Sequence, residues 1–399
     1  MTLTDTIDTA ATSATTTAPA NDQPSLGPSI TPDPNSPFFM SSTEWQTVQC
    51  YVQTGLQLPT TAADAQTKLG ISDTDAGTFS DLWSAYAQIE GHCADFSNNI
   101  FPTVVALAGD IADFGHNEAP TYYSGITQVY QGMKDGSIAH ADGVADIQAI
   151  LAQLQSDTAS RASNVDAAVT KINGFVTETT QDQGLITPIQ KKYDDEYEGM
   201  GGKIKSYQDE IDLDQTTIAA ANVEYKKDCL LAETAATYAW VFPAGTIAAA
   251  VVAGIYGQRA VEALHRIRSS QDDLETMEAD LKAAILLKQD LQLSTTSLAG
   301  IVTALNNAMP VLQTVQGVWN ALGTDIGKLL TQVDNLPDPS KAIPFIESLA
   351  VDAATKAWGG LADEADQFRV NAFVTVQPLT QVQANLAANP HAYDLQTAA

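Results

Sequence analysis

Apolar residues recur at helical spacing along most of the chain. From Val144 to about Thr180 they fall every three or four residues, and a similar period covers 78–111 and 298–333. Residues three and four apart share one face of an α-helix, so these stretches predict amphipathic helices that each bury one stripe. Strand patterns are scarce. The chain is therefore predicted to be all-α, an elongated bundle of long antiparallel helices.

Proline and glycine interrupt this pattern at several places. Pro102 and Pro310 predict kinks, and the stretch from Gly115 to Pro120 predicts a break. Gly184 and Pro188 predict another break or kink near the end of the long repeat. The last helix is expected over 344–373, followed by a loose tail.

One stretch departs from the amphipathic pattern. Thr234–Gln258, called the apolar segment below, has 25 residues and no charge. Its strongest part, Tyr238–Ile255, would be ~27 Å long as a straight helix, close to the ~30 Å hydrocarbon core of a bilayer. Pro243 argues against one straight helix, so Pro243 and Gly245 are predicted to form a turn between two arms.

The two arms suggest a membrane-inserting role. The first is aromatic, which suits the headgroup level, and the second is aliphatic. Small residues recur every four positions in the second arm, which would let helices approach closely. Strand is left open for this arm. The residues predicted to insert are Tyr238, Trp240, Val241, Phe242, Ile247, Val251, Val252, Ile255 and Tyr256, and the small helix-contact face is Ala249, Ala253 and Gly257.

The helices on either side shape this prediction. Residues 204–231 show a heptad repeat, and no proline or glycine falls between Gly257 and Gly300. Two such helices pack antiparallel only if the apolar segment is the tip between them. Basic residues also flank the segment and would meet anionic headgroups, namely Lys226, Lys227, Arg259, Arg266 and Arg268. The segment further fits the loose cholesterol-contact pattern at Val252, Tyr256 and Arg259.

Charge and cysteine content narrow the function classes. The formal net charge is −29, with 19 Lys and Arg among 399 residues. Nucleic acid is excluded as a partner, because phosphate contacts need a basic patch. Cys50, Cys93 and Cys229 are an odd set without CxxC spacing, so neither a disulfide framework nor a zinc site is predicted, although one bridge remains open.

The termini and the boundaries follow from composition. The N-terminus has no basic start followed by an apolar run, so export is expected to use a route other than the Sec signal. The predicted organisation is a disordered segment 1–37, helical bundle 38–230, an apolar head 231–259, helical bundle 260–376, and a loose tail 377–399.

Catalytic chemistry is not predicted. The five histidines lack metal-ligand spacing, and Gly202-Lys203 lacks the rest of a phosphate-loop motif. The many carboxylates fall on the solvated faces of amphipathic helices. No enzyme activity, cofactor or metal is therefore expected.

The pattern resembles the α-helical pore-forming toxins of the cytolysin A superfamily. That group includes the components of haemolysin BL and the non-haemolytic enterotoxin, helical Cry-type toxins, and the Xax/Yax and motility-associated cytotoxins. The resemblance covers about residues 40–375 and rests on the long helices, the uncharged tip and the Leu-striped helix after it. It implies a soluble protein whose hydrophobic tongue, sometimes a β-hairpin, inserts into a target-cell membrane as a ring assembles.

Two hypotheses of different class follow. The first is a pore-forming cytotoxin, or one component of a multi-part toxin, that assembles with copies of itself or with sister chains. The second is a non-catalytic coiled-coil scaffold or interaction protein in which the apolar segment is a buried helix. Whether the chain acts alone is left open by its sequence.

Overall fold

The fold is described by a computed structural model. It describes residues 24–30, 48–49, 51–53, 55–69, 71–196, 238–242, 251–252, 279–335, 346–347, 349–371, 374–378 and 388. The chain forms two compact units. Unit 1 combines Met1–Phe38, Ile111–Ser163 and Thr314–Glu364, and unit 2 combines Phe39–Asp110, Asn164–Gln313 and Ala365–Ala399.

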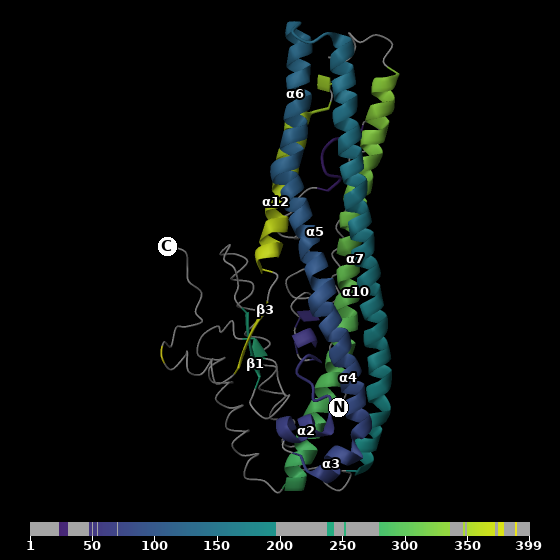
Figure 1. Cartoon of the computed structure of the whole chain (residues 1–399), viewed down its shortest axis with the longest axis vertical. Helices are drawn as coiled ribbons and strands as arrows, with labels where there is room; N and C mark the ends of the chain where they lie inside the picture. Colours follow the sequence, from purple (N-terminus) through teal and green to yellow (C-terminus); the bar gives the residue numbers. More distant parts are fainter. Residues whose placement is uncertain are drawn as a thin grey trace, which may run out of the picture. The chain divides into compact units, whose positions relative to one another are not determined.

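Helices account for most of the described residues, which confirms the predicted all-α class (Figure 1). They are α2 (Ala62–Leu69), α3 (Asp73–Thr78), α4 (Ser80–Asp95), η1 (Phe96–Ile100), α5 (Phe101–Asp113), η2 (Phe114–Glu118), α6 (Ala119–Asp135), α7 (His140–Glu196), α10 (Ala279–Asp334) and α12 (Val351–Asn371). Helix α7 has 57 residues and is therefore about 85 Å long.

Prolines inside the helices are accommodated without a break. A proline lacks an N–H and its ring crowds the carbonyl four residues earlier. For Pro102 and Pro120 that carbonyl lies in a single π-helical turn, η1 and η2 respectively, where the wider turn relieves the crowding. The backbone is consequently helical without interruption from Ser80 to Asp135.

One predicted interruption is therefore wrong. The stretch from Gly115 to Pro120 is a π-turn joined to α6 and is not a break. Pro188 lies inside α7 and Pro310 lies inside α10, so neither proline ends its helix, and the kinks predicted there stay predictions. Sequence pattern alone predicts that a proline disturbs a helix, but not whether neighbouring packing holds the helix together across it.

Unit 1 has an aromatic centre. The rings of Trp319 and Trp358 stack with centroids 5.3 Å apart, and Phe114 meets both edge-on at 5.1 and 4.6 Å. The guanidinium of Arg161 lies 5.1 Å from the Phe114 centroid and 5.6 Å from that of Trp319, and it bonds Glu118 at 2.5 Å. One cation thus joins α7, η2 and α10 through a ring face and a carboxylate.

Helices α7 and α10 are antiparallel within unit 1. As α10 proceeds toward its C-terminus, its neighbours on α7 move toward the N-terminus of α7. The pairs that show this are Thr158 beside Gly323, Gln155 beside Gly327, and Gln148 hydrogen-bonded to Asp334.

A short N-terminal stretch also belongs to unit 1. Leu26 is fully buried, and its carbonyl oxygen accepts hydrogen bonds from the Tyr123 hydroxyl and, at 2.8 Å, from the Trp358 indole N–H. The backbone N–H of Ser25 donates to Asp325 at 3.0 Å. The sequence predicted disorder for 1–37, yet residues 24–30 lie against α6, α10 and α12 through these contacts.

In unit 2, aromatic pairs pack η1 and the residue before α4 against α7. The Phe96 and Phe175 rings lie 4.6 Å apart, and those of Phe79 and Tyr193 lie 6.3 Å apart. The hydroxyl of Tyr193 donates to the carbonyl of Ala284 on α10. These contacts join the described helices of unit 2 into a bundle.

Gly115 offers a test of the packing of unit 1. A methyl group there would collide with the carbonyl oxygen of Trp358 and lie 2.7 Å from the Cβ of Ala362. We expect Gly115→Ala to lower the free energy of unfolding by about 1–3 kcal/mol, because the backbone of α12 must move. Urea unfolding followed by circular dichroism measures this.

Gly174→Ala is the matched control. Gly174 lies in α7 with open space around its Cα. Alanine favours helix over glycine by roughly 0.5–1 kcal/mol, so this variant should be slightly stabilised. Equal stability of Gly115→Ala and Gly174→Ala would contradict the close approach of η2 and α12.

Candidate membrane-inserting segment

The described part of the apolar segment is β-strand. Strand β1 (Tyr238–Phe242) pairs antiparallel with β2 (Val251–Val252), with Trp240 opposite Val252 and Val241 opposite Val251. An antiparallel pair joined by a short connection is a β-hairpin. Of the two conformations that the sequence left open, the strand is the one observed at these residues.

A third strand completes the sheet. Strand β3 (Val374–Pro378) runs parallel to β1, in register from Tyr238 opposite Val374 to Phe242 opposite Pro378. The strand order is β2-β1-β3, so β1 is central. All three strands belong to unit 2.

The sequence reasoning missed β3. It assigned 260–376 to helical bundle and 377–399 to a loose tail, whereas Val374 to Pro378 form a strand. A signal was present, because Val374-Thr375-Val376 is a run of β-branched residues closed by a proline. Five residues are short, and nothing local says which strand they pair with.

The predicted inserting residues fall partly in the sheet. Tyr238, Trp240, Val241 and Phe242 lie in β1, and Val251 and Val252 lie in β2. The remaining site residues lie outside the described residues: Ile247, Ile255, Tyr256, the turn residues Pro243 and Gly245, the small face Ala249, Ala253 and Gly257, and the basic flanks Lys226, Lys227, Arg259, Arg266 and Arg268. The heptad region 204–231 also lies outside them.

A helix that crosses a bilayer needs about 20 predominantly apolar residues. Within the described ranges, no helix is both long enough and apolar enough to cross a membrane.

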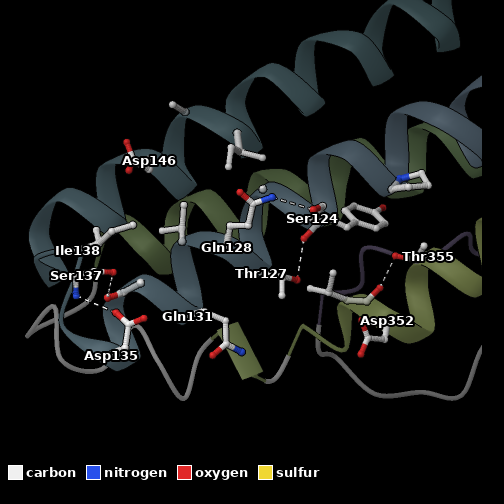
Figure 2. A pocket seen from close by; sticks show the side chains of 18 residues that line it. Ser124, Thr127, Gln128, Gln131, Asp135, Ser137, Ile138, Asp146, Asp352 and Thr355 are labelled. Carbon is white, nitrogen blue, oxygen red and sulfur yellow. Dashed lines mark hydrogen bonds between the residues drawn. The ribbon is translucent and has the colours of Figure 1, made fainter.

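Unit 1 contains a surface groove of about 1020 Å³ between α6, α7 and α12 (Figure 2). Its polar side chains bond locally. Gln128 donates to Ser124 at 3.1 Å, and the backbone N–H of Ser137 donates to Asp135 at 2.9 Å. Hydrogen bonds from Ser137 hold the pKa of Asp135 below its ordinary value.

The described lining residues of this groove include no histidine, cysteine, lysine or arginine. Across the part of the chain that the structure describes, no three His, Cys, Asp or Glu side chains gather as a metal site.

A buried polar pair lies inside unit 2. The Asp182 side chain on α7 is only 1% exposed, and its Oδ2 lies 2.9 Å from Nδ1 of His92 on α4. Its other oxygen has no hydrogen-bond partner among the described residues. Burial raises the pKa of Asp182, an effect that His92 partly offsets. Burial also raises the pKa of the neighbouring free Cys93 thiol, which disfavours the thiolate form.

Asp182 predicts a pH dependence of stability. Its pKa is raised in the folded state, so between the ordinary value of about 4 and that raised value the folded state binds more protons than the unfolded state. Stability from this group is therefore present at low pH and is lost as the pH rises through that window. Asparagine does not titrate, so the unfolding free energy of Asp182→Asn relative to that of the wild type should increase from pH 4 to pH 7.

Urea unfolding at several pH values checks this. Asp146→Asn serves as the control, because Asp146 is exposed and loses the same charge. A pH trend that is the same in both variants would show that burial of Asp182 is not its cause.

Known proteins are similar to this chain at low identity. No family model matches it. Pesticidal crystal protein Cry6Ba of Bacillus thuringiensis is 23% identical over 363 residues, covering 84% of this chain and 89% of Cry6Ba. The toxin component HblL1 of Bacillus cereus superposes with a TM-score of 0.60 at 13% identity, covering 84% of this chain and 95% of HblL1.

A further solved structure gives the same result. Soluble SmhB of the tripartite α-pore-forming toxin Smh from Serratia marcescens superposes with a TM-score of 0.55 at 14% identity, covering 87% of this chain and 96% of SmhB. The two superpositions establish the fold, and they cover nearly the full length of HblL1 and SmhB. The chain has the fold of α-pore-forming toxin components, which confirms the resemblance seen in its sequence.

Proposed function

We propose that this chain is a non-catalytic component of a pore-forming toxin, and that its apolar segment enters the membrane of a target cell. One observation carries the proposal: an uncharged stretch of 25 residues contributes β1 and β2 to a small sheet, in a chain that has the fold of α-pore-forming toxin components. The helical units supply the scaffold, and the apolar segment supplies the part that leaves water.

Physical chemistry supports insertion of this segment. Transfer of apolar groups out of water is favourable by about 0.8 kcal/mol per methylene, and Tyr238–Ile255 contains 18 residues without a charge. An open sheet edge is not tolerated in hydrocarbon, because its backbone groups would lack partners. Insertion therefore requires that the hairpin become helical or join a closed assembly. A helix over Tyr238–Ile255 would be ~27 Å long and close to the bilayer core.

Partners follow from the same proposal. SmhB is described as part of a tripartite toxin, and we infer that this chain likewise assembles on the membrane with sister chains or with copies of itself. The net charge of −29 opposes anionic surfaces at long range, so the basic residues Lys226, Lys227, Arg259, Arg266 and Arg268 are proposed to face the headgroups. Cholesterol contact at Val252, Tyr256 and Arg259 is part of the proposal.

The test places a charge in the segment. Asp at the centre of a membrane-crossing helix costs roughly 2.5–3.5 kcal/mol, which is about 100-fold in an equilibrium constant. Val251→Asp should therefore reduce association with phosphatidylcholine–cholesterol vesicles by about 100-fold, measured by flotation, and reduce dye release where the wild type causes it. Flotation reports insertion even if a pore needs sister chains.

Thr177→Asp is the matched control. Thr177 is exposed on α7, so the variant gains the same charge outside the segment and should float like the wild type. Circular dichroism of all three proteins ensures that folded chains are compared. A folded Val251→Asp protein that floats as well as the wild type would remove the apolar segment from the mechanism and favour a scaffold role.

A further inference from the structure

The central strand of the sheet has two different neighbours. On one edge, β1 pairs with β2, which follows it in the hairpin; on the other edge it pairs with β3, more than 130 residues later in the chain. Among the described residues, pairing with β2 includes Trp240 and Val241 of β1. Pairing with β3 spans all five residues, from Tyr238 to Phe242. Every residue of β1 therefore has a partner on β3.

The pairing with β3 is important for the stability of the hairpin. An isolated two-stranded hairpin is only marginally stable in water, and a third strand is generally needed. Without β3, the edge of β1 would expose unpaired N–H and C=O groups. The third strand is thus the element on which the strand conformation of β1 depends.

Strand β3 is tied closely to the helices. Helix α12 ends at Asn371 and β3 begins at Val374, so three Cα–Cα steps, about 11 Å at most, separate them. Helix α12 is anchored, because Trp358, Leu361 and Ala365 are fully buried. The tether prevents β3 from following β1 over a long distance.

The end of β3 fits an edge position. Phe242 is opposite Pro378, and proline cannot donate a hydrogen bond to a ladder. Proline is therefore tolerated at an edge strand or at the end of a ladder, which is where the order β2-β1-β3 places it. The pairing can separate at this end without the loss of an amide donor at Pro378.

We propose that β3 is a latch: the C-terminal strand holds the apolar segment in its strand form, and β1 must separate from β3 before the segment can enter a membrane. The latch rests on the proposed function, because it regulates that insertion. It is an intramolecular contact between two segments that are far apart in sequence. Conditions that break the β1–β3 pairing are expected to activate the chain.

A reversible cross-link tests the latch. Ala239 and Thr375 are partners in the β1–β3 register. Adjacent strands lie about 4.8 Å apart, within the range that a disulfide can span. The double variant Ala239→Cys/Thr375→Cys, made in a Cys50→Ser/Cys229→Ser background, should float with vesicles at least tenfold less when oxidised than when reduced. Each single-cysteine variant in the same background is a control and should float like the wild type under both conditions.

A truncated chain that ends at Asn371 tests the latch from the other direction. The backbone amides of residues 238–242 should exchange their hydrogens at least tenfold faster when β3 is removed. The truncated chain should also associate with vesicles at a lower concentration than the full chain. Vesicles of phosphatidylcholine and cholesterol are used throughout, and size-exclusion chromatography selects monomeric protein.

The outcomes separate the two proposals. If the wild type floats and the oxidised double variant floats equally well, the latch is wrong while the proposed function stands. Unchanged exchange at 238–242 after truncation would also overturn the latch, because β3 would not be holding β1. If neither the wild type nor the reduced double variant floats, the proposed function is overturned, and the latch with it.

Discussion

The backbone pairing of β1 is the interaction on which the apolar segment depends. A helix pairs its own backbone groups, whereas the backbone groups of a strand pair with neighbouring strands. Strand β1 finds one neighbour within the hairpin and the other at residues 374–378, close to the C-terminus. The conformation of an uncharged segment in mid-chain is therefore set by residues far away in sequence. Conversion to a helix would replace these distant partners with local ones.

The two helical units depend on packing between side chains of different helices. Helices α7 and α10 each contribute to both units and contain a proline, yet both continue through it. In unit 1 the packing that holds the helices together is specific: η2 brings Gly115 against the backbone of Trp358, and Arg161 joins the Phe114 and Trp319 rings to Glu118. Close packing of this kind supports a π-turn that a free helix would not retain.

Local patterns were sufficient to predict some of these features. The apolar period of α7 and α10, the absence of charge in 234–258 and the resemblance to helical toxins were readable because each depends on neighbouring residues. The burial of Leu26, the strand at Val374 and the π-turn before Pro120 were not. Leu26 lies in a stretch rich in proline and polar residues, and its partners, Tyr123 and Trp358, are distant in sequence.

Strand β2 shows how local preference and observed structure can oppose each other. Val251 and Val252 favour strand, but the residues before them are Ala248, Ala249 and Ala250, and alanine is the best helix former. Among the described residues, Val251 and Val252 form β2. Such a conflict between local preference and fold raises the free energy of the observed state relative to a helical alternative. A segment that is to change conformation on entering lipid benefits from this arrangement, because its strand form is maintained by partners and is weakly favoured by its own sequence.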